Sequence, residues 1–220
     1  MYNRVLVGCF AVIFLIITSS CSQSREEKRI KASDEKFQSI ASEIPDTILS
    51  KALGFAIVPN FIRAGAGVSG FQGQGVLSIK MQDGCWSYPA FISFSDISVG
   101  LQAGGQITDV VLIFMTKRSI DAFADGKVNL GSGISVEKGP LRSKGEPGKS
   151  ADVYYYAKNR GAYIGASFDG ASINIDNNAN EKFYDSKDIT YEKIMQNQIN
   201  DVPKESEEFK ENLVKIAGGC

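Results

Sequence analysis

The side chains that could perform chemistry in this chain are carboxylates, lysines, tyrosines and cysteines, because its 220 residues include no histidine. Without histidine, neither a Ser-His-Asp or Cys-His nucleophile nor a histidine-ligated zinc site can be built. Hydrolysis by paired carboxylates stays open, with a pool made of Asp109, Asp152, Asp169 and Asp176. Each lies at a predicted strand end or turn, so no pair has a defined spacing. We therefore expect no catalytic residues, no metal site and no cofactor.

Cys21 separates a short apolar segment from a long polar one. Val5 to Ile17 is apolar, Arg4 precedes it, and the small residues Thr18 to Ser20 lead to the cysteine. About 13 apolar residues suit the central region of a signal peptide and are too few to cross a ~30 Å bilayer as a stable helix. The segment resembles a bacterial lipoprotein signal, although Thr18 stands where an aliphatic residue is usual.

This resemblance implies that the Cys21 thiol takes up a diacylglyceryl group, that residues 1–20 are removed, and that the new N-terminus is acylated. Several acyl chains, such as palmitate, hold a protein to a membrane almost permanently. We expect a lipoprotein of the bacterial cell envelope, facing the periplasm from the outer membrane, because Ser22 rather than aspartate follows Cys21. The alternative is an ordinary secretory signal that is cut near Ser20.

The remaining charge is nearly balanced. Without residues 1–20, the chain has 23 basic and 25 acidic residues, because Arg4 is the only charged side chain removed, and its net charge is −2. A nucleic-acid-binding protein usually has a strong basic excess, so we expect no nucleic-acid partner. Beyond the N-terminal segment, no stretch is long and apolar enough to span a membrane.

Two cysteines remain once Cys9 has left with the signal and Cys21 is lipidated. Cys85 and Cys220 could form a disulfide in an oxidising periplasm. The alternative for Cys85, which lies between the Asp83-Gly84 turn and Trp86, is a buried thiol.

Basic and aromatic residues supply weaker candidates for binding. Four basic residues near Cys21 could contact anionic headgroups, but Glu26 and Glu27 dilute their charge, so a solvated helix face is equally consistent. Two more flank the predicted strands and could bind phosphate. The full candidate set is Arg25, Lys28, Arg29, Lys31, Lys51 and Arg63. Tyr154, Tyr155 and Tyr156 could form a binding stripe, but alternate residues of a strand face opposite sides, so one face is expected in the core.

Two motifs resemble ligand sites but lack the necessary context. Gly65 to Gly70 matches the dinucleotide pattern GxGxxG, yet turn and strand residues follow it where a phosphate site needs a helix. Asp176 to Asn180 resembles the start of a calcium loop, but Glu181 replaces the required glycine and Lys187 the bidentate glutamate. We interpret the first as bent strand and the second as an Asn-rich turn.

Helices are predicted at both ends of the chain. Ile30, Phe37, Ile40 and Ile44 form an apolar stripe typical of an amphipathic helix. A short helix starts at Pro45 and stops at Gly54, and amphipathic helices follow over 189–199 and 203–216. One short internal helix is expected from Ser119, as its cap, to Phe123.

The centre of the chain reads as strands. The predicted segments are 55–58, 61–69, 75–81, 90–94, 98–103, 110–115, 134–137, 153–158, 162–168 and 172–175. Pro59-Asn60 is expected to break the chain, Asp83-Gly84 to form a hairpin turn, and Asn159 to Gly161 another turn. Frequent glycines within strands fit tight curvature, as in a small closed barrel. The fold class is therefore α+β, with an antiparallel, strongly curved or barrel-like sheet and amphipathic helices at both termini.

Together these segments resemble the SYLF lipid-binding domain family, which occurs in bacterial lipoproteins and in eukaryotic regulators of actin and membranes. The resemblance rests on Ile44-Pro45-Asp46, Lys51 to Pro59, Gly73 to Leu77, Gly84 to Phe91, Asp109 to Met115, Leu130-Gly131, Lys138-Gly139-Pro140 and Asn180 to Tyr184. It implies a sheet-rich α+β domain without enzyme activity. Relatives bind phosphoinositides or phosphatidic acid, some bind actin, and lipid binding is associated with an N-terminal amphipathic helix and basic residues.

We accordingly divide the chain into a signal peptide (1–20), a lipidated tether with an amphipathic helix (21–43), a SYLF-like domain (44–184) and C-terminal helices (185–220). The favoured function is non-catalytic binding of phospholipid or a membrane surface, with no actin partner expected in a bacterial envelope. The alternatives are a periplasmic protein-interaction or structural module, for which lipidation only sets the location, and a carboxylate hydrolase.

Overall fold

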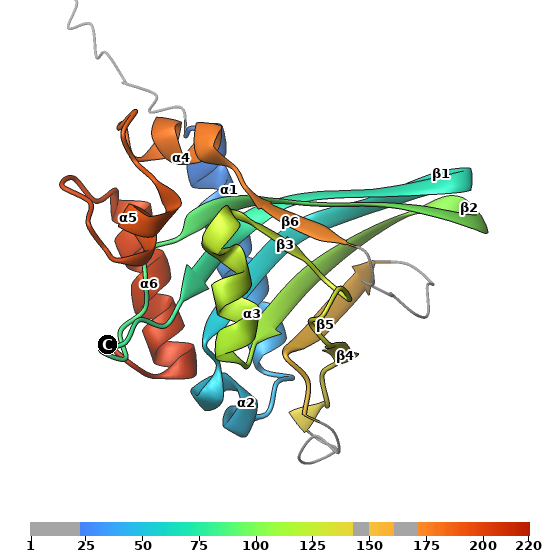
Figure 1. Ribbon diagram of the computed structural model, residues 1–220, viewed down its shortest axis with the longest axis horizontal. Helices are drawn as coiled ribbons and strands as arrows, with labels where there is room; N and C mark the ends of the chain where they lie inside the picture. The colour runs from blue at the N-terminus through green and yellow to red at the C-terminus, as the bar shows by residue number, and fades with distance from the viewer. Residues whose placement is uncertain (1–22, 143–149, 161–170) are drawn as a thin grey trace, which may run out of the picture.

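A long β-hairpin dominates the computed structural model, which describes residues 23–142, 150–160 and 171–220 (Figure 1). β1 (Gly54–Ile79) has 26 residues and β2 (Ala90–Phe114) has 25. They pair antiparallel from Gly54 opposite Phe114 to Leu77 opposite Ala90. The predicted turn at Asp83-Gly84 lies in their connection, where Gly84 has a φ of 85°.

The hairpin bends back on itself, so that each strand has an outgoing and a returning leg. A straight strand of this length would span roughly 85 Å. Yet the residues that flank β1 meet, because the Lys80 amide donates to the Leu53 carbonyl at 2.8 Å. The legs also touch further along, since a Cβ at Gly75 would lie 2.8 Å from the carbonyl carbon of Ile57. Glycine is required there because no Cβ fits between the two backbones.

Four short strands extend the sheet from the β2 edge of the hairpin. β5 (Val153–Arg160) pairs with one end of β2, and β4 (Val136–Lys138) runs parallel to β5. β6 (Ser172–Ile175) pairs with the other end of β2, and β3 (Lys127–Asn129) pairs with β6. Within the described residues, these six strands form one sheet that curls into a half-barrel.

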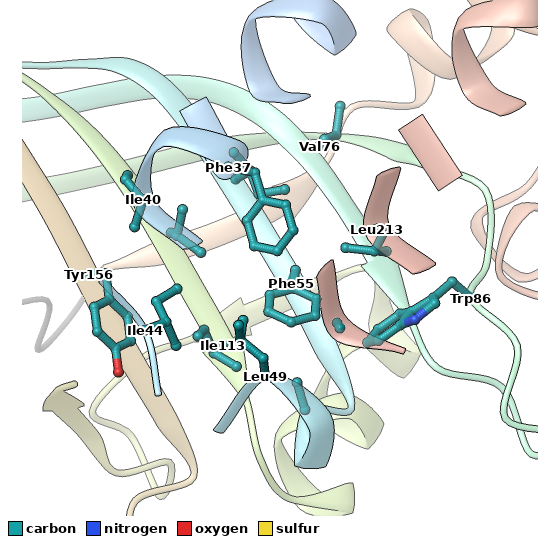
Figure 2. Packing of buried hydrophobic residues seen from close by; sticks show 14 of the residues in the cluster. Phe37, Ile40, Ile44, Leu49, Phe55, Val76, Trp86, Ile113, Tyr156 and Leu213 are labelled. Atoms are coloured by element: carbon teal, nitrogen blue, oxygen red, sulfur yellow. The ribbon is translucent and has the colours of Figure 1, made fainter. Parts of the chain in front are cut away.

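Alternate residues of the curled sheet enter two separate cores. Ala56, Leu112 and Phe114 face the inside of the curl, together with Phe123. Their neighbours along the strands face outward and pack beneath helices. These residues include Ile57 and Val111, and also Phe55 and Ile113, which are labelled in Figure 2. The run 110–114 is fully apolar because it is covered on both faces, as its sequence predicted.

Helices α1 (Arg25–Ala41) and α6 (Lys204–Ala217) cover the outer face. α1 contributes Ile30, Phe37 and Ile40, and the Phe37 ring lies 4.9 Å from that of Phe55. α6 contributes Phe209 and Leu213. Fully burying each of these side chains contributes ~1.5–3 kcal/mol, so the helices are integral to the fold.

The other helices are short. α2 (Asp46–Lys51) links α1 to β1, and α3 (Lys117–Asp121) continues as a 3₁₀ turn (Ala122–Asp125) that closes the inside of the curl. α4 (Asn177–Phe183) and α5 (Tyr191–Met195) connect β6 to α6.

The fold class is confirmed, whereas several element boundaries were wrong. The strands predicted over 55–81 are one continuous β1, and those over 90–115 are one continuous β2. Pro59 and Asn60 produce a register shift instead of a break, with Asn60 at a φ of 50°. Strand bulges of this kind accommodate a proline and one positive φ without ending the pairing.

Corrections at helix ends have local causes. Gly54 begins β1 and does not end α2, which stops at Lys51. Thr116, and not Ser119, caps α3, because the Thr116 hydroxyl accepts the Ser119 amide. The helix expected over 189–199 is reduced to the five residues of α5.

Three further predictions shift in the central and C-terminal parts. The strand expected at 134–137 lies at Val136–Lys138. Asn159 and Arg160 belong to β5 and not to a turn. The Asn-rich segment is helix α4, which begins because the Asp176 side chain accepts the Ala179 amide as its N-cap. The strand expected at 162–168 lies outside the described residues.

Candidate functional site

The N-terminal end of α1 presents three of the predicted basic residues to solvent. Ser24 and Glu27 form a capping box, in which each side chain accepts the backbone amide of the other residue. This box fixes where the helix starts and hence the directions of the side chains that follow. Lys28 and Lys31 are exposed, and Arg25 is exposed with a hydrogen bond to Gln74 of 2.6 Å.

Arg29 does not belong to this exposed set. Its side chain is 8% exposed, forms an ion pair with Asp176 at 3.0 Å and lies over the Phe91 ring at 4.9 Å. It also donates to the carbonyl oxygen of Ile92. Burial lowers the pKa of Arg29, although the hydrogen bond and charge of Asp176 oppose this effect. Arg29 therefore ties α1 to α4 and β2, and its guanidinium is not available to a lipid headgroup.

Lys51 lies apart from the basic end of α1. It is exposed at the end of α2, which follows the opposite end of α1 (Figure 1). Because α1 has 17 residues, the two ends are separated by about 25 Å of helix. The backbone of Arg63 pairs with Gln106 within the hairpin, but its side chain lies outside the described residues, as do Cys21 and the whole segment 1–22.

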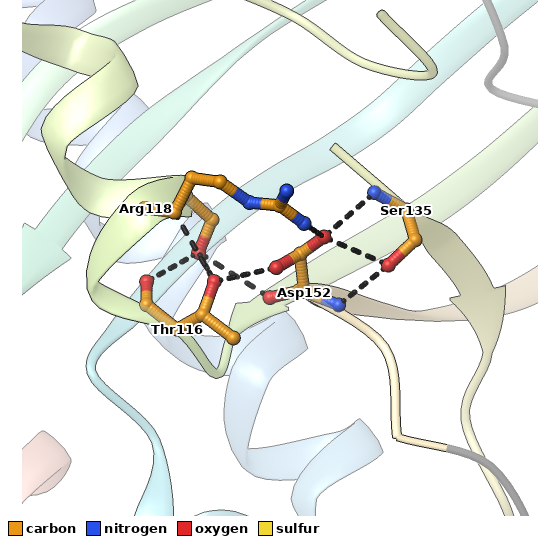
Figure 3. Close-up of polar contacts among 5 residues, drawn as sticks. Thr116, Arg118, Ser135 and Asp152 are labelled. Carbon is orange, nitrogen blue, oxygen red and sulfur yellow. Dashed lines mark hydrogen bonds and ion pairs between the residues drawn. The ribbon is translucent and has the colours of Figure 1, made fainter. Parts of the chain in front are cut away.

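A second polar cluster surrounds the buried carboxylate of Asp152 (Figure 3). One carboxylate oxygen accepts the Thr116 hydroxyl at 2.8 Å. The other accepts the amide of Ser135 at 2.9 Å, its hydroxyl at 2.8 Å, and the guanidinium of Arg118. Burial alone would raise the pKa of Asp152, but these hydrogen bonds outweigh it and hold the pKa well below its usual range. Asp152 thus joins α3 to the starts of β4 and β5.

The other candidate carboxylates also have structural partners. Asp109 accepts the Asn60 amide at 2.9 Å and pairs with Lys36 at 3.0 Å. Asp176 caps α4 and pairs with Arg29, and Asp169 lies outside the described residues. Asp109 lies opposite Lys158, five residues along β5 from Val153, so it does not face Asp152. The described residues contain no cluster of cysteine and carboxylate side chains that could hold a metal ion. The geometry therefore assembles no carboxylate pair from Asp109, Asp152 and Asp176.

The tyrosine stripe is part of the core. Tyr154 and Tyr156 are buried beneath the α1 side of the sheet, at 4% and 5% exposure, while Tyr155 is half-buried on the inner side. Burial raises the pKa of Tyr156, whose hydroxyl donates to the Pro140 carbonyl at 2.9 Å. The alternation predicted for a strand is therefore confirmed, and the stripe offers little aromatic surface to a partner. Likewise, Gly65 to Gly70 lies in the middle of β1, with no helix after it.

Cys85 and Cys220 form a disulfide, which is the first of the two alternatives for these residues. It joins the β1–β2 connection to the segment after α6, across 135 residues of sequence. Beside it lies an open groove of about 460 Å³, whose lining includes Tyr88, Lys210, Val214 and Cys220. The Lys210 ammonium lies 4.9 Å from the Tyr88 ring centre. Sequence patterns gave no signal for this groove, because its sides come from residues more than 100 positions apart.

The surface of the hairpin carries a pair of exposed large apolar residues. Ile62 and Ile107 lie directly opposite each other on β1 and β2 and are 51% and 44% exposed. Among the described helices, none has the length and apolar character that a membrane span requires.

Comparison with known proteins identifies relatives of this chain. The model of a family described as Las17-binding protein actin regulator, Ysc84, matches residues 95–216. LAS seventeen-binding protein 3 of Saccharomyces cerevisiae is 34% identical over 167 residues, which cover 73% of this chain and 36% of the yeast protein. No solved structure matches the chain.

Vertebrate proteins are similar as well. SH3 domain-containing YSC84-like protein 1 of Xenopus laevis is 32% identical over 203 residues, 87% of this chain and 59% of that protein. Its Homo sapiens namesake is 34% identical over 146 residues, 64% of this chain and 42% of the human protein. The chain thus spans about a third of the length of the yeast relative and more of the vertebrate ones. By the extent of these matches, and in agreement with its SYLF-like segments, the chain belongs to the Ysc84 family of Las17-binding, actin-regulator-type proteins.

Proposed function

We propose that this chain is a non-catalytic binding module, held at a membrane by a lipid on Cys21, that contacts anionic phospholipid headgroups through α1. The observation that carries the proposal is the exposure of Arg25, Lys28 and Lys31 in the first two turns of α1. Only Ser22 to Ser24 separate that helix from Cys21. Extended chain of this length reaches roughly 14 Å, so lipidation would keep the basic end of α1 beside the headgroups.

The strength of this contact follows from the charges. A basic residue close to an anionic leaflet contributes ~1 kcal/mol, so three would contribute ~3 kcal/mol before Glu26 and Glu27 are counted. This is far weaker than a multi-chain lipid anchor, at ~0.8 kcal/mol per buried methylene. In this proposal the anchor supplies the attachment and α1 sets which side of the module faces the bilayer. The expected place is the periplasmic face of a bacterial outer membrane.

Vesicle flotation tests the lipid contact. The Cys21→Ser protein, without the anchor, should bind phosphatidylglycerol-containing vesicles at low salt and release them as salt is raised. A further Lys28→Ala/Lys31→Ala change should weaken binding about 30-fold, the equivalent of ~2 kcal/mol. The matched control is Lys204→Ala/Lys215→Ala, which removes two exposed lysines of α6. Equal losses in both double variants, or no binding at all, would contradict the assignment to α1. Intact-mass measurement of the mature N-terminus tests the anchor separately.

The second candidate is a protein-interaction module, for which lipidation only sets the location. The name of the yeast relative, LAS seventeen-binding protein 3, describes binding to another protein, and the exposed pair Ile62 and Ile107 supplies an apolar contact on this chain. A pull-down from envelope extract that returns one stoichiometric partner, lost on Ile62→Ser/Ile107→Ser, would favour this function. A protein confined to a bacterial envelope would not meet actin, so the actin-regulator description is not carried over.

A further inference from the structure

The segment Gly218–Cys220, which follows α6, lies on the buried face of Trp86. The Trp86 indole donates to the Gly218 carbonyl at 2.6 Å, and the Trp86 amide donates to the Cys220 carbonyl at 3.0 Å. Trp86 is the single tryptophan of the chain and is fully buried in the outer core, beside Phe55 (Figure 2). Both donors belong to Trp86, in the β1–β2 connection, so the segment connects the end of α6 to the sheet.

Two glycines allow the segment to take this path. Gly218 and Gly219 have φ values of 72° and 101°, in the region that favours glycine. A Cβ at Gly219 would lie 2.7 Å from the Gly84 carbonyl oxygen and 3.2 Å from the Trp86 indole nitrogen. Only glycine therefore fits between the β1–β2 connection and the indole, and the fit brings Cys220 to Cys85.

The disulfide closes this arrangement from a position that solvent can reach. Cys220 is exposed and Cys85 is half-buried. α6 itself is held by Phe209 and Leu213 in the core, and by polar contacts that include Asn212 to Asp34 at 2.7 Å. Without the disulfide, the end of α6 would depend on the two Trp86 hydrogen bonds, on the helix packing and on these polar contacts.

We propose that Gly218–Cys220 is a redox-operated clasp that decides how firmly α6 covers Trp86. A dithiol reductant attacks the disulfide through its thiolate, passes through a mixed disulfide, and leaves with its own two sulfurs bonded. Two electrons and two protons thereby reach the protein, in which Cys85 and Cys220 become thiols. A disulfide oxidant reverses the reaction: its own sulfur–sulfur bond is reduced to two thiols as the Cys85–Cys220 bond forms. The reduced protein opens at α6 more often and exposes Trp86, while the curled sheet stays folded.

The test compares the oxidised protein, the protein reduced with dithiothreitol, and the Cys85→Ser/Cys220→Ser variant. We expect the hydrogen-exchange rates of the α6 amides to rise about 30-fold in both forms that lack the disulfide. This ratio corresponds to ~2 kcal/mol, the low end of the stabilisation that a disulfide usually provides. Acrylamide should also quench Trp86 fluorescence more strongly, whereas far-ultraviolet circular dichroism should show that the strands of the sheet stay formed. If α6 exchange and Trp86 quenching match the oxidised protein within threefold, the clasp does not depend on the disulfide and the proposal is overturned.

A second variant leaves both cysteines in place. In a glutathione redox buffer, Gly219→Ala should make formation of the Cys85–Cys220 disulfide about tenfold less favourable, which means a tenfold lower effective concentration of one thiol at the other. The reason is that the segment can no longer lie flat on Gly84. The control is Gly133→Ala, at a φ of 78° with no atom within 4 Å of its added Cβ. It carries the cost of positive φ without the clash and should leave the thiol equilibrium unchanged. Equal behaviour of the two variants would refute the idea that this segment is shaped for the clasp.

Discussion

Replacing Gly75 with alanine should destabilise this protein more than the same replacement at Gly73 or Gly133. The new Cβ would lie 2.8 Å from the Ile57 carbonyl carbon and 2.9 Å from the Val58 Cα, both of them backbone atoms. A side chain could rotate away, but here the two legs of β1 must move apart. Overpacking that side chains can relieve costs ~1–3 kcal/mol, so we expect a loss of about 3 kcal/mol or more. For a chain of this size that lowers the melting temperature by about 6–12 °C.

The two matched variants separate the clash from other effects of losing a glycine. Gly73→Ala would place its Cβ 2.6 Å from Phe61 Cδ2, a side-chain atom that can move, so its loss of stability should be smaller. Gly133→Ala meets no atom within 4 Å and carries only the cost of its positive φ, about 1 kcal/mol. Urea unfolding followed by circular dichroism should rank the stabilities in this order. If Gly75→Ala is as stable as Gly133→Ala, the legs of β1 do not touch and the fold-back is refuted.

Three further changes probe the buried charges and the clasp. Asp152→Asn should lower the free energy of unfolding in urea by about 2 kcal/mol. Because the pKa of Asp152 is depressed in the folded protein, its carboxylate stabilises the fold above pH ~4, and this contribution is lost as the pH falls further. The stability of the variant should therefore fall less steeply than that of the wild type as the pH is lowered. Arg29→Met should cost ~3 kcal/mol because it leaves Asp176 unpaired, whereas exposed Arg25→Met should cost under ~1 kcal/mol in the same assay. Reduction of the Cys85–Cys220 disulfide should lower stability by up to about 5 kcal/mol, as a 135-residue separation implies, and a shift of the thermal midpoint smaller than about 5 °C would contradict this.

The sequence predicted those elements whose signal is local. The apolar run 110–114 indicated a strand covered on both faces, and the burial of these residues confirms this. Ser172 to Ile175 was located to the residue, because Asp-Gly and Asn-rich segments flank it. The amphipathic stripes of α1 and α6 likewise emerged from the period of their apolar residues.

The doubling back of β1 could not be predicted, because its cause is a contact between distant residues. Pro59 and the glycines from Gly65 to Gly75 each resemble the end of a strand when only their sequence neighbours are compared. In the folded protein the glycines permit backbone to lie on backbone, as at Gly75 against Ile57. A local interpretation therefore divides one strand into three, although it correctly attributes the glycines to curvature.

The candidate site shows the same limit for charged residues. Arg25, Lys28, Arg29 and Lys31 are equivalent in sequence as basic residues near Cys21, yet Arg29 is buried and its neighbours are exposed. The difference arises because Asp176, 147 residues away, supplies a partner for one of them. Helical periodicity could have found it, since Arg29 lies one residue before Ile30 and one turn before Ser33, on the buried side.

The burial of α1 determines how this module can contact a bilayer. An amphipathic helix that inserts into a membrane must expose its apolar face, but Ile30, Phe37 and Ile40 are at most 3% exposed against the sheet. In the bilayer these side chains would stay buried, but the sheet residues beneath them, such as Phe55, Ile57 and Val111, would be uncovered; that would cost about 6 kcal/mol at ~2 kcal/mol each, besides the loss of the Arg29–Asp176 pair. Three basic side chains return only ~3 kcal/mol at an anionic surface. Insertion of α1 is therefore unfavourable while the half-barrel is folded, and the energetics favour a peripheral, salt-sensitive contact in which α1 stays on the sheet and its solvent side meets the headgroups.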